Sequence, residues 1–279
     1  MWYSYYSTSE EDRSEIIHYI KNADLFWVGV SVFLGILTHL SRAVRWNYLL
    51  QPLGYRPKLF NNILIILTAY FTNLGIPRSG EILRATALAT YEHVPFQKGF
   101  GTIVTERVID LVMLFLIVAI ALFLQTDIIW GFLQQKGFNL ALLLVLLAAG
   151  ILVLSLGMYV VKKSKSKFAL KLKTFLRGLL EGILSIFRMK NKWGFVLHTL
   201  FIWLAYIAMF WVIKYTVLET VDLSVSQLLV GFVAGAFAMS ATNGGIGIYP
   251  IAVSSALAIF GISKVSGDAL DGLCGFRKL

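Results

Sequence analysis

The chain has 279 residues, of which 58% are hydrophobic and 14% are charged, and its mean hydropathy is +0.75. Soluble domains carry about 25% charged residues, so this composition excludes a soluble globular protein and predicts an integral membrane protein. The formal net charge is +10, but many of the cations gather between apolar stretches, which indicates a cytoplasmic loop and argues against a nucleic-acid partner. The single cysteine, Cys274, excludes a disulfide framework and a CxxC site.

The chain divides into three parts. Residues 1–24 form a polar, acidic N-terminal tail that lacks the basic region and apolar core of a signal peptide. Residues 25–267 are predicted to form a single polytopic membrane domain. Residues 268–279 lose apolar periodicity where a further span is expected, so we expect an irregular C-terminal tail, with truncation as one interpretation.

Several stretches are long and apolar enough to cross a bilayer, which takes about 20 residues. The predicted spans are 25–38, extendable to 50, then 100–124, 140–161 and 193–217. Residues 59–76 are also apolar but end in a stretch rich in helix-breakers. Residues 228–260 are long enough for more than one pass but are cut in the middle by TNGGIGIYP.

The two interruptions resemble each other, because each has a Thr-Asn pair followed by helix-breakers. Such breaks at corresponding places in two halves are typical of the discontinuous helices of inverted-repeat transporters. Irregular backbone is not tolerated against lipid, so it must face protein or a wet cavity. An ordinary turn between two short helices is the alternative. The predicted backbone breaks are Gly75, Pro77, Gly80, Gly244, Gly245, Gly247 and Pro250.

The distribution of cations predicts how these segments cross. Residues 162–192 form a basic loop between the two halves, and the positive-inside rule places it in the cytoplasm. A complete crossing by 59–76 would then leave Arg42, Arg45, Arg56 and Lys58 outside. A segment that enters and returns keeps them in the cytoplasm. We therefore predict an all-α membrane bundle with two re-entrant hairpins inserted from opposite faces, in an inverted repeat.

Charged residues inside a membrane cost at least about 2–3 kcal/mol each and mark functional sites by default. Glu81 and Arg84 are three residues apart, so they are neighbours on one helical face and form the strongest candidate. Glu106, Arg107 and Asp110 head an apolar run, where they form either a salt-bridge clamp between helices or a substrate contact. The predicted substrate-binding residues are Glu81, Arg84, Glu106, Arg107, Asp110 and Asn243.

Other ionisable residues of the apolar segments have simpler interpretations. Arg42 and Arg45 are interpreted as anchors at a helix end, whose charged heads reach the interface. His39 and His198 lack the spacing of metal ligands and are expected to be hydrogen-bonded helix residues. Lys214 is expected to be interfacial.

Motifs for catalysis do not occur. The chain has no P-loop, no GxSxG elbow and no HExxH zinc motif, so we expect no catalytic residues, no metal site and no cofactor. A charged cavity lined by broken helices suits an amphiphile with an anionic or zwitterionic head. Free N–H groups at the positive end of a half-helix favour phosphate.

Four motifs carry a resemblance to the lysylphosphatidylglycerol synthase transmembrane-region family, also described as flippase-like domain proteins. They are LSRAVRWNYLLQPLG (40–54), NLGIPRSGEILRATAL (73–88), GTIVTERVIDLVML (101–114) and NGGIGIYP (243–250). The order and spacing of the middle two are fairly specific, and the resemblance covers residues 22–267.

The resemblance implies a polytopic membrane domain related to the part of aminoacyl-phospholipid synthases that is thought to move lipid between leaflets. The signature positions carry over onto Gly80, Glu81, Arg84, Glu106, Arg107 and Asp110, and the later Gly-rich break onto Asn243, Gly244, Gly245 and Gly247. The chain departs from the family pattern at its polar start, and in the residues around the later break. The soluble synthase domain is also not found, so lysyl transfer by this chain alone is not expected.

The expected function is therefore non-enzymatic translocation of a phospholipid or lipid-linked precursor across a bacterial inner membrane. A first alternative is a membrane subunit of a lipid- or glycan-modifying enzyme, such as an aminoacyl-phospholipid synthase, with a soluble transferase as partner. A second alternative is a structural membrane scaffold.

Overall fold

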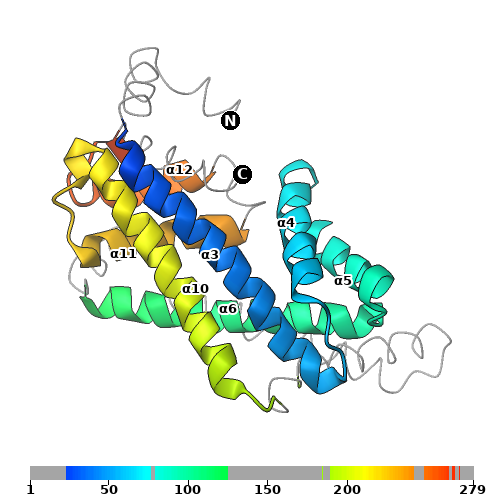
Figure 1. The fold of residues 1–279 in the computed structure, drawn as a ribbon. Coiled ribbons are helices and arrows are strands. Elements are labelled where there is room, and N and C mark those ends of the chain that lie inside the picture. The colour runs from blue at the N-terminus through cyan, green and yellow to red at the C-terminus, as the bar shows by residue number, and fades with distance from the viewer. Residues whose placement is uncertain are drawn as a thin grey trace, which may run out of the picture.

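The structure is a computed structural model that describes residues 23–76, 79–124, 184, 189–241, 248–263, 266–267 and 270. This part of the chain is all-α, as predicted (Figure 1). The predicted span 140–161 and most of the basic loop lie outside the described residues. The α-helices are α3 (Leu25–Leu50), α4 (Leu59–Gly75), α5 (Ser79–Glu92), α6 (Phe96–Leu124), α10 (Lys192–Ile213), α11 (Val225–Ala241) and α12 (Ile248–Ala258).

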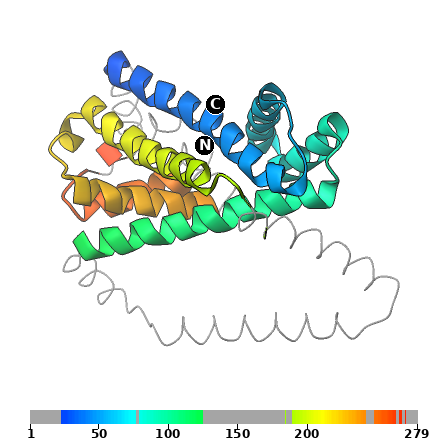
Figure 2. The same cartoon turned by 60° about the horizontal axis from the view of Figure 1, so that its bottom comes forward.

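Three of the described helices, α3, α6 and α10, are long and apolar enough to cross a membrane, which confirms three of the predicted spans. The helices α3 and α10 lie side by side and antiparallel, and α6 crosses them (Figures 1 and 2). At one end of the pair Trp27 of α3 stacks on Tyr215, with 4.7 Å between ring centroids. At the other end Tyr48 lies 5.9 Å from the ring of His198, near the start of α10.

Local signals set the start of two of these helices. The side chain of Asp24 accepts a hydrogen bond from the backbone N–H of Phe26 at 2.9 Å, and Asn191 accepts one from Gly194 at 3.0 Å. Such caps satisfy N–H groups that have no partner in the first helical turn. After α3, Gly54 adopts a φ of 89°, which favours glycine and lets the chain turn towards α4.

The helices α4 and α5 form a hairpin that returns to the end from which it starts. Asn61 near the start of α4 donates a hydrogen bond to Glu92 at the end of α5, and Lys98 in the first turn of α6 lies over the ring of Tyr55. With 17 and 14 residues, α4 and α5 are about 25 and 21 Å long, short of a hydrocarbon core of about 30 Å. These lengths fit the predicted re-entrant hairpin, whose depth in a bilayer stays a prediction.

Gly80 has a different role from the predicted backbone break. It is the second residue of α5 and is helical and buried, while the chain reverses just before it, after Gly75 and Ile76. A Cβ at this position would lie 2.6 Å from the carbonyl oxygen of Ala69 and 2.7 Å from the Asn73 side chain. Asn73 in turn accepts a hydrogen bond from the Gly80 N–H at 2.8 Å. Gly80 therefore lets α4 and α5 approach closely, while Pro77 lies outside the described residues.

The helices α11 and α12 form a second hairpin, which starts and ends at the opposite end of the bundle. Glu219 before α11 accepts a hydrogen bond from the backbone N–H of Ser263 after α12, at 3.1 Å. Hydrogen bonds from Ser263 hold the pKa of the Glu219 carboxyl below its ordinary value. Pro250, a predicted break, instead lies in the first turn of α12, where its missing N–H costs no helical hydrogen bond. The intervening Asn243, Gly244, Gly245 and Gly247 lie outside the described residues.

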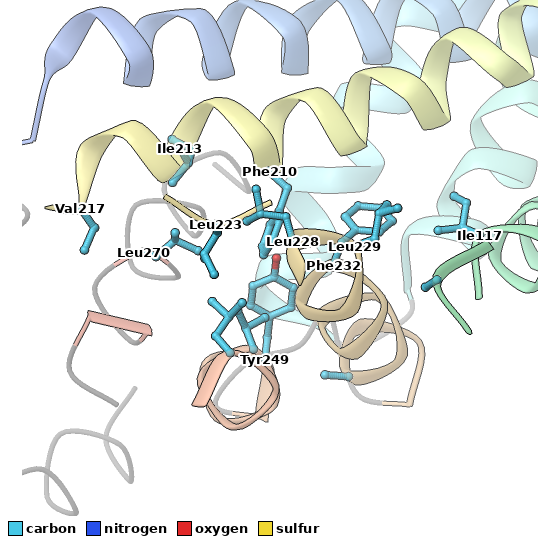
Figure 3. Close-up of a cluster of buried hydrophobic side chains, with 14 of the residues drawn as sticks. Ile117, Phe210, Ile213, Val217, Leu223, Leu228, Leu229, Phe232, Tyr249 and Leu270 are labelled. Carbon is cyan, nitrogen blue, oxygen red and sulfur yellow. The ribbon is translucent and has the colours of Figure 1, made fainter. Parts of the chain in front are cut away.

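Two apolar clusters hold the bundle together on either side of the charged part of α6. The first joins α6, α10, α11 and α12, with Phe210 and Phe232 at its centre (Figure 3). The second joins α3, α4, α5 and the start of α6, and includes Trp46 and Ile103. Between them α6 carries Glu106, Arg107 and Asp110.

Replacing Gly80 by alanine tests the close approach of α4 and α5. The added Cβ overlaps backbone as well as side-chain atoms, so Gly80→Ala should lower the free energy of unfolding by about 1–3 kcal/mol. Thermal unfolding of the purified protein in detergent measures this change. The matched control is Gly29→Ala in α3, where a Cβ meets nothing within 4 Å and alanine favours the helix. Equal melting temperatures for the two variants would contradict the contact.

Cysteine labelling in sealed vesicles tests the sidedness of the bundle ends. In a chain in which Cys274 is replaced by serine, Arg56→Cys and Lys192→Cys should react from one side and Glu219→Cys from the other. The reason is that Gly194, at the start of α10, lies against Tyr48 near the end of α3. A membrane-impermeant maleimide measures the reaction before and after lysis. Reaction of the first two cysteines from opposite sides would rule out this topology.

Candidate functional site

The centre of the charged site is Arg45, which α3 places between two carboxylates of α6. Its Nη1 donates a hydrogen bond to Asp110 Oδ1 at 3.0 Å, and its Nη2 lies 3.6 Å from Glu106 Oε1. Glu106 and Asp110 are four residues apart on α6, so one guanidinium reaches both. The Arg45 side chain is completely buried and that of Glu106 is 1% exposed. This pairing joins α3 to α6 inside the span.

Arg84 of α5 meets the same carboxylate from another direction. Its Nη2 lies 2.8 Å from Glu106 Oε2, and its guanidinium stacks over the Trp46 ring at 4.2 Å. The indole N–H of Trp46 donates to Thr102 Oγ1 at 2.9 Å. A cation held between a carboxylate and an aromatic face is fixed in position. Arg84, Arg45 and Glu106 therefore form a clamp that joins α3, α5 and α6.

Arg42 extends the network to α10. Its Nη2 lies 3.7 Å from Asp110 Oδ2, and its Nε donates to the Tyr206 hydroxyl at 3.0 Å. Tyr206 belongs to α10, so this hydrogen bond links the charged site of the first half to the second half of the chain.

Arg107 and Glu81 form the accessible part of the network. Arg107 Nε lies 3.7 Å from Glu81 Oε1, and Arg107 Nη1 lies 3.6 Å from Asp110 Oδ2. Their side chains are 45% and 31% exposed, whereas the other charged members are at most 12% exposed. Arg107 lies eleven residues after the start of α6, about 16 Å along the helix, so the accessible charges lie within the span.

The network holds an excess of positive charge. Four guanidiniums, those of Arg42, Arg45, Arg84 and Arg107, face three carboxylates, which leaves one net positive charge. Buried donors and acceptors without a hydrogen-bond partner in the described part occur on both sides of the network, among them Nε of Arg45 and Arg84 and both carboxylate oxygens of Glu106. Burial of an ion costs several kcal/mol unless charges and hydrogen bonds compensate it. An anion is therefore the ligand that this arrangement favours.

The structure brings together five of the six predicted substrate-binding residues, while Asn243 lies outside the described residues. The predicted pair of Arg107 and Asp110 is confirmed. Glu81 and Arg84, the predicted neighbours on one face of α5, have partners on another helix. Each reaches across to α6, Arg84 to Glu106 and Glu81 to Arg107, because the α6 partners lie opposite them.

The interpretation of Arg42 and Arg45 as interfacial anchors is wrong. Both are buried, because α3 continues to Leu50 and places them inside the bundle opposite α6. Their spacing of three residues on one helical face, with carboxylates at a spacing of four on a later span, is the signal that could have identified them.

Three further polar residues have defined contacts. His198 shares a hydrogen bond of 2.8 Å with Ser41, as expected for a helix residue. His39 packs edge-on against Tyr70, and its Nδ1 has no hydrogen-bond partner in the described part, contrary to expectation. Lys214 is buried and donates to the carbonyl of Leu223 at 2.8 Å. The described residues contain no group of three or more His, Cys, Asp or Glu side chains that could hold a metal ion.

Apolar spans, two short hairpins and a buried ionic network define a polytopic α-helical membrane protein. The sequence pattern of the lysylphosphatidylglycerol synthase TM region matches residues 1–270, and the chain belongs to this family.

Two relatives are similar over about a third of the chain. UPF0104 membrane protein MJ1595 of Methanocaldococcus jannaschii is 32% identical over 99 residues, which cover 34% of this chain and 30% of that protein. Glycosyltransferase AglD of Haloferax volcanii is 31% identical over 101 residues, which cover 36% of this chain and 16% of that protein. The chain thus matches less than a third of the length of these relatives. No solved structure matches the chain.

Removing the charge of Glu106 tests the clamp. Glu106→Gln should lower the free energy of unfolding by about 3–5 kcal/mol, because Arg45 and Arg84 lose a buried counter-ion. Thermal unfolding in detergent measures the loss. The double variant Glu106→Gln with Arg84→Gln restores the charge balance and should recover part of it. Asp222→Asn, on an exposed loop, is the control and should melt as the wild type does. Unchanged melting of Glu106→Gln would contradict the clamp.

Proposed function

We propose that this protein moves the head group of a phospholipid or lipid-linked precursor across the membrane through the charged site, without itself being an enzyme. The observation that carries the proposal is Arg107, a guanidinium inside a membrane span whose side chain is 45% exposed and whose ion pairs are no shorter than 3.6 Å. A charge in this position is costly unless it has a function. The phosphate of a lipid head group is an anion that a guanidinium binds through two parallel hydrogen bonds.

The arrangement of the helices supports transport. The two short hairpins start from opposite ends of the bundle, and the charged site lies where α5 of the first hairpin meets α3 and α6. Many transporters place their substrate near the bilayer midplane between discontinuous helices inserted from opposite faces. On this proposal Asn243, in the second break, contributes to the same site, and the inverted repeat relates the two halves.

The orientation follows from the cations. We place loop 162–192 in the cytoplasm and the chain in a bacterial inner membrane, with residues 25–267 as one membrane domain. Arg56, Lys58, Lys98 and the start of α10 lie at one end of the bundle, which supports a common cytoplasmic side for these cations.

A second candidate function is that of a membrane subunit in lipid or glycan modification. It is favoured by the match to glycosyltransferase AglD, whose name describes an enzyme. In that case the charged site presents a lipid-linked substrate to a soluble transferase partner. Conversion of a lipid by the purified chain together with such a transferase, and by neither alone, would support this function.

Exchange of lipid between leaflets tests transport. In vesicles containing a fluorescent phospholipid, the wild-type chain should speed exchange, and Arg107→Gln should slow it at least about tenfold, because a charge-assisted hydrogen bond contributes about 1.5–3 kcal/mol. Loss of outer-leaflet fluorescence after dithionite addition measures the rate. The matched control is Arg56→Gln, which removes an exposed arginine outside the network. Equal rates for the two variants would show that Arg107 has no role in transport. If the wild type exchanges no lipid, the remaining functions are those of an enzyme subunit or a structural scaffold.

A further inference from the structure

The ion pair between Glu81 and Arg107 is longer than the two shortest pairs of the network, as are two of its buried pairs. Arg84 and Arg45 reach their carboxylates at 2.8 Å and 3.0 Å, which is the range of charge-assisted hydrogen bonds. Arg107 lies 3.7 Å from Glu81, which is too long for a hydrogen bond. The pair is also the most exposed of the network. Its electrostatic attraction is therefore modest, and another anion can compete with Glu81 for Arg107.

The charges around Arg107 make such competition favourable. With Glu81 in place, four guanidiniums face three carboxylates, and without its charge they face only two. Glu81 therefore lowers the positive charge that an approaching anion meets. Glu81 also lies in the first turn of α5, where the helix dipole stabilises its carboxylate when Arg107 is engaged elsewhere.

We infer that Glu81 determines the specificity of the site as an internal competitor: its carboxylate occupies Arg107 until the phosphodiester of a lipid head group displaces it. The inference rests on the proposed head-group site and adds the residue that controls entry to it. A phosphodiester offers two oxygens to one guanidinium, so it can replace the loose pair with two short hydrogen bonds. A head group without an anion cannot do so, and the pair then stays closed. The site thus discriminates against ligands that cannot replace the contact between Glu81 and Arg107.

Binding of a soluble short-chain lipid tests this role without requiring transport. The probe is dihexanoyl phosphatidylglycerol below its critical micelle concentration, titrated into the purified full chain in detergent and followed by tryptophan fluorescence. Glu81→Gln should bind the probe about three- to tenfold more tightly, because the competitor is neutral. Arg107→Gln should bind it at least about tenfold more weakly. Glu81→Asp shortens the side chain and keeps its charge, so it should tighten binding less than Glu81→Gln. It replaces Glu81→Gln in the test if that variant does not fold.

The control separates competition from general electrostatics. Glu92→Gln removes one negative charge from the other end of α5, where Glu92 bonds Asn61, and should leave binding unchanged. Unchanged or weaker binding by Glu81→Gln, or equal tightening by Glu92→Gln, would overturn the inference. Inorganic phosphate is titrated in parallel, and equal affinity for it would overturn the assignment to a lipid. If Glu81→Gln binds the lipid more tightly but the wild type exchanges no lipid between leaflets, the proposed transport function is wrong. The role of Glu81 as a competitor is then still supported.

Discussion

The structure depends on one constraint: a guanidinium inside a membrane domain must be met by carboxylates. Arg45 is completely buried, and it is stable there because α6 presents Glu106 and Asp110 to it. The cost of an unpaired buried charge is several kcal/mol, so α3 and α6 cannot separate without exposing it. Helices in a membrane associate through close packing and through polar contacts, and the ionic pairs add a specific register to the packing of the apolar clusters. The clamp thus sets the relative position of three helices.

Around this constraint the network divides into a fixed and an adaptable part. Arg45, Arg84 and Glu106 are buried, Arg84 lies 2.8 Å from Glu106, and Trp46 covers Arg84. Arg107 and Glu81 lie 3.7 Å apart and are accessible. A transport site needs both properties, because the helices must keep their places while the ligand contacts exchange. On the proposed function, the inner charges supply a positive potential, and the accessible pair is the contact that the ligand replaces.

The two hairpins explain how such a site can lie among membrane spans. Each consists of helices of at most 17 residues and returns to the end from which it came, and the two start from opposite ends of the bundle. Close packing within each hairpin relies on glycine, as at Gly80 against Ala69 and at Gly235 against Tyr249. The first hairpin brings Glu81 and Arg84 against the charged residues of α6.

The sequence by itself determined that the chain spans a membrane, because its apolar stretches are long and its charge content is low. It also determined where three of the long helices lie and which charged motifs contribute to the ionic network. These properties are local, because a stretch of about 20 apolar residues is long enough to form a membrane-spanning helix whatever the rest of the chain does. Only the tertiary structure decided the pairing. Spacing made Glu81 and Arg84 neighbours on one helical face, and the structure adds their partners on α6. Arg42 and Arg45 were interpreted as anchors, yet both are buried. The way in which four helices cross decides which side chains meet. The spacing of residues along one helix carries no information about that crossing.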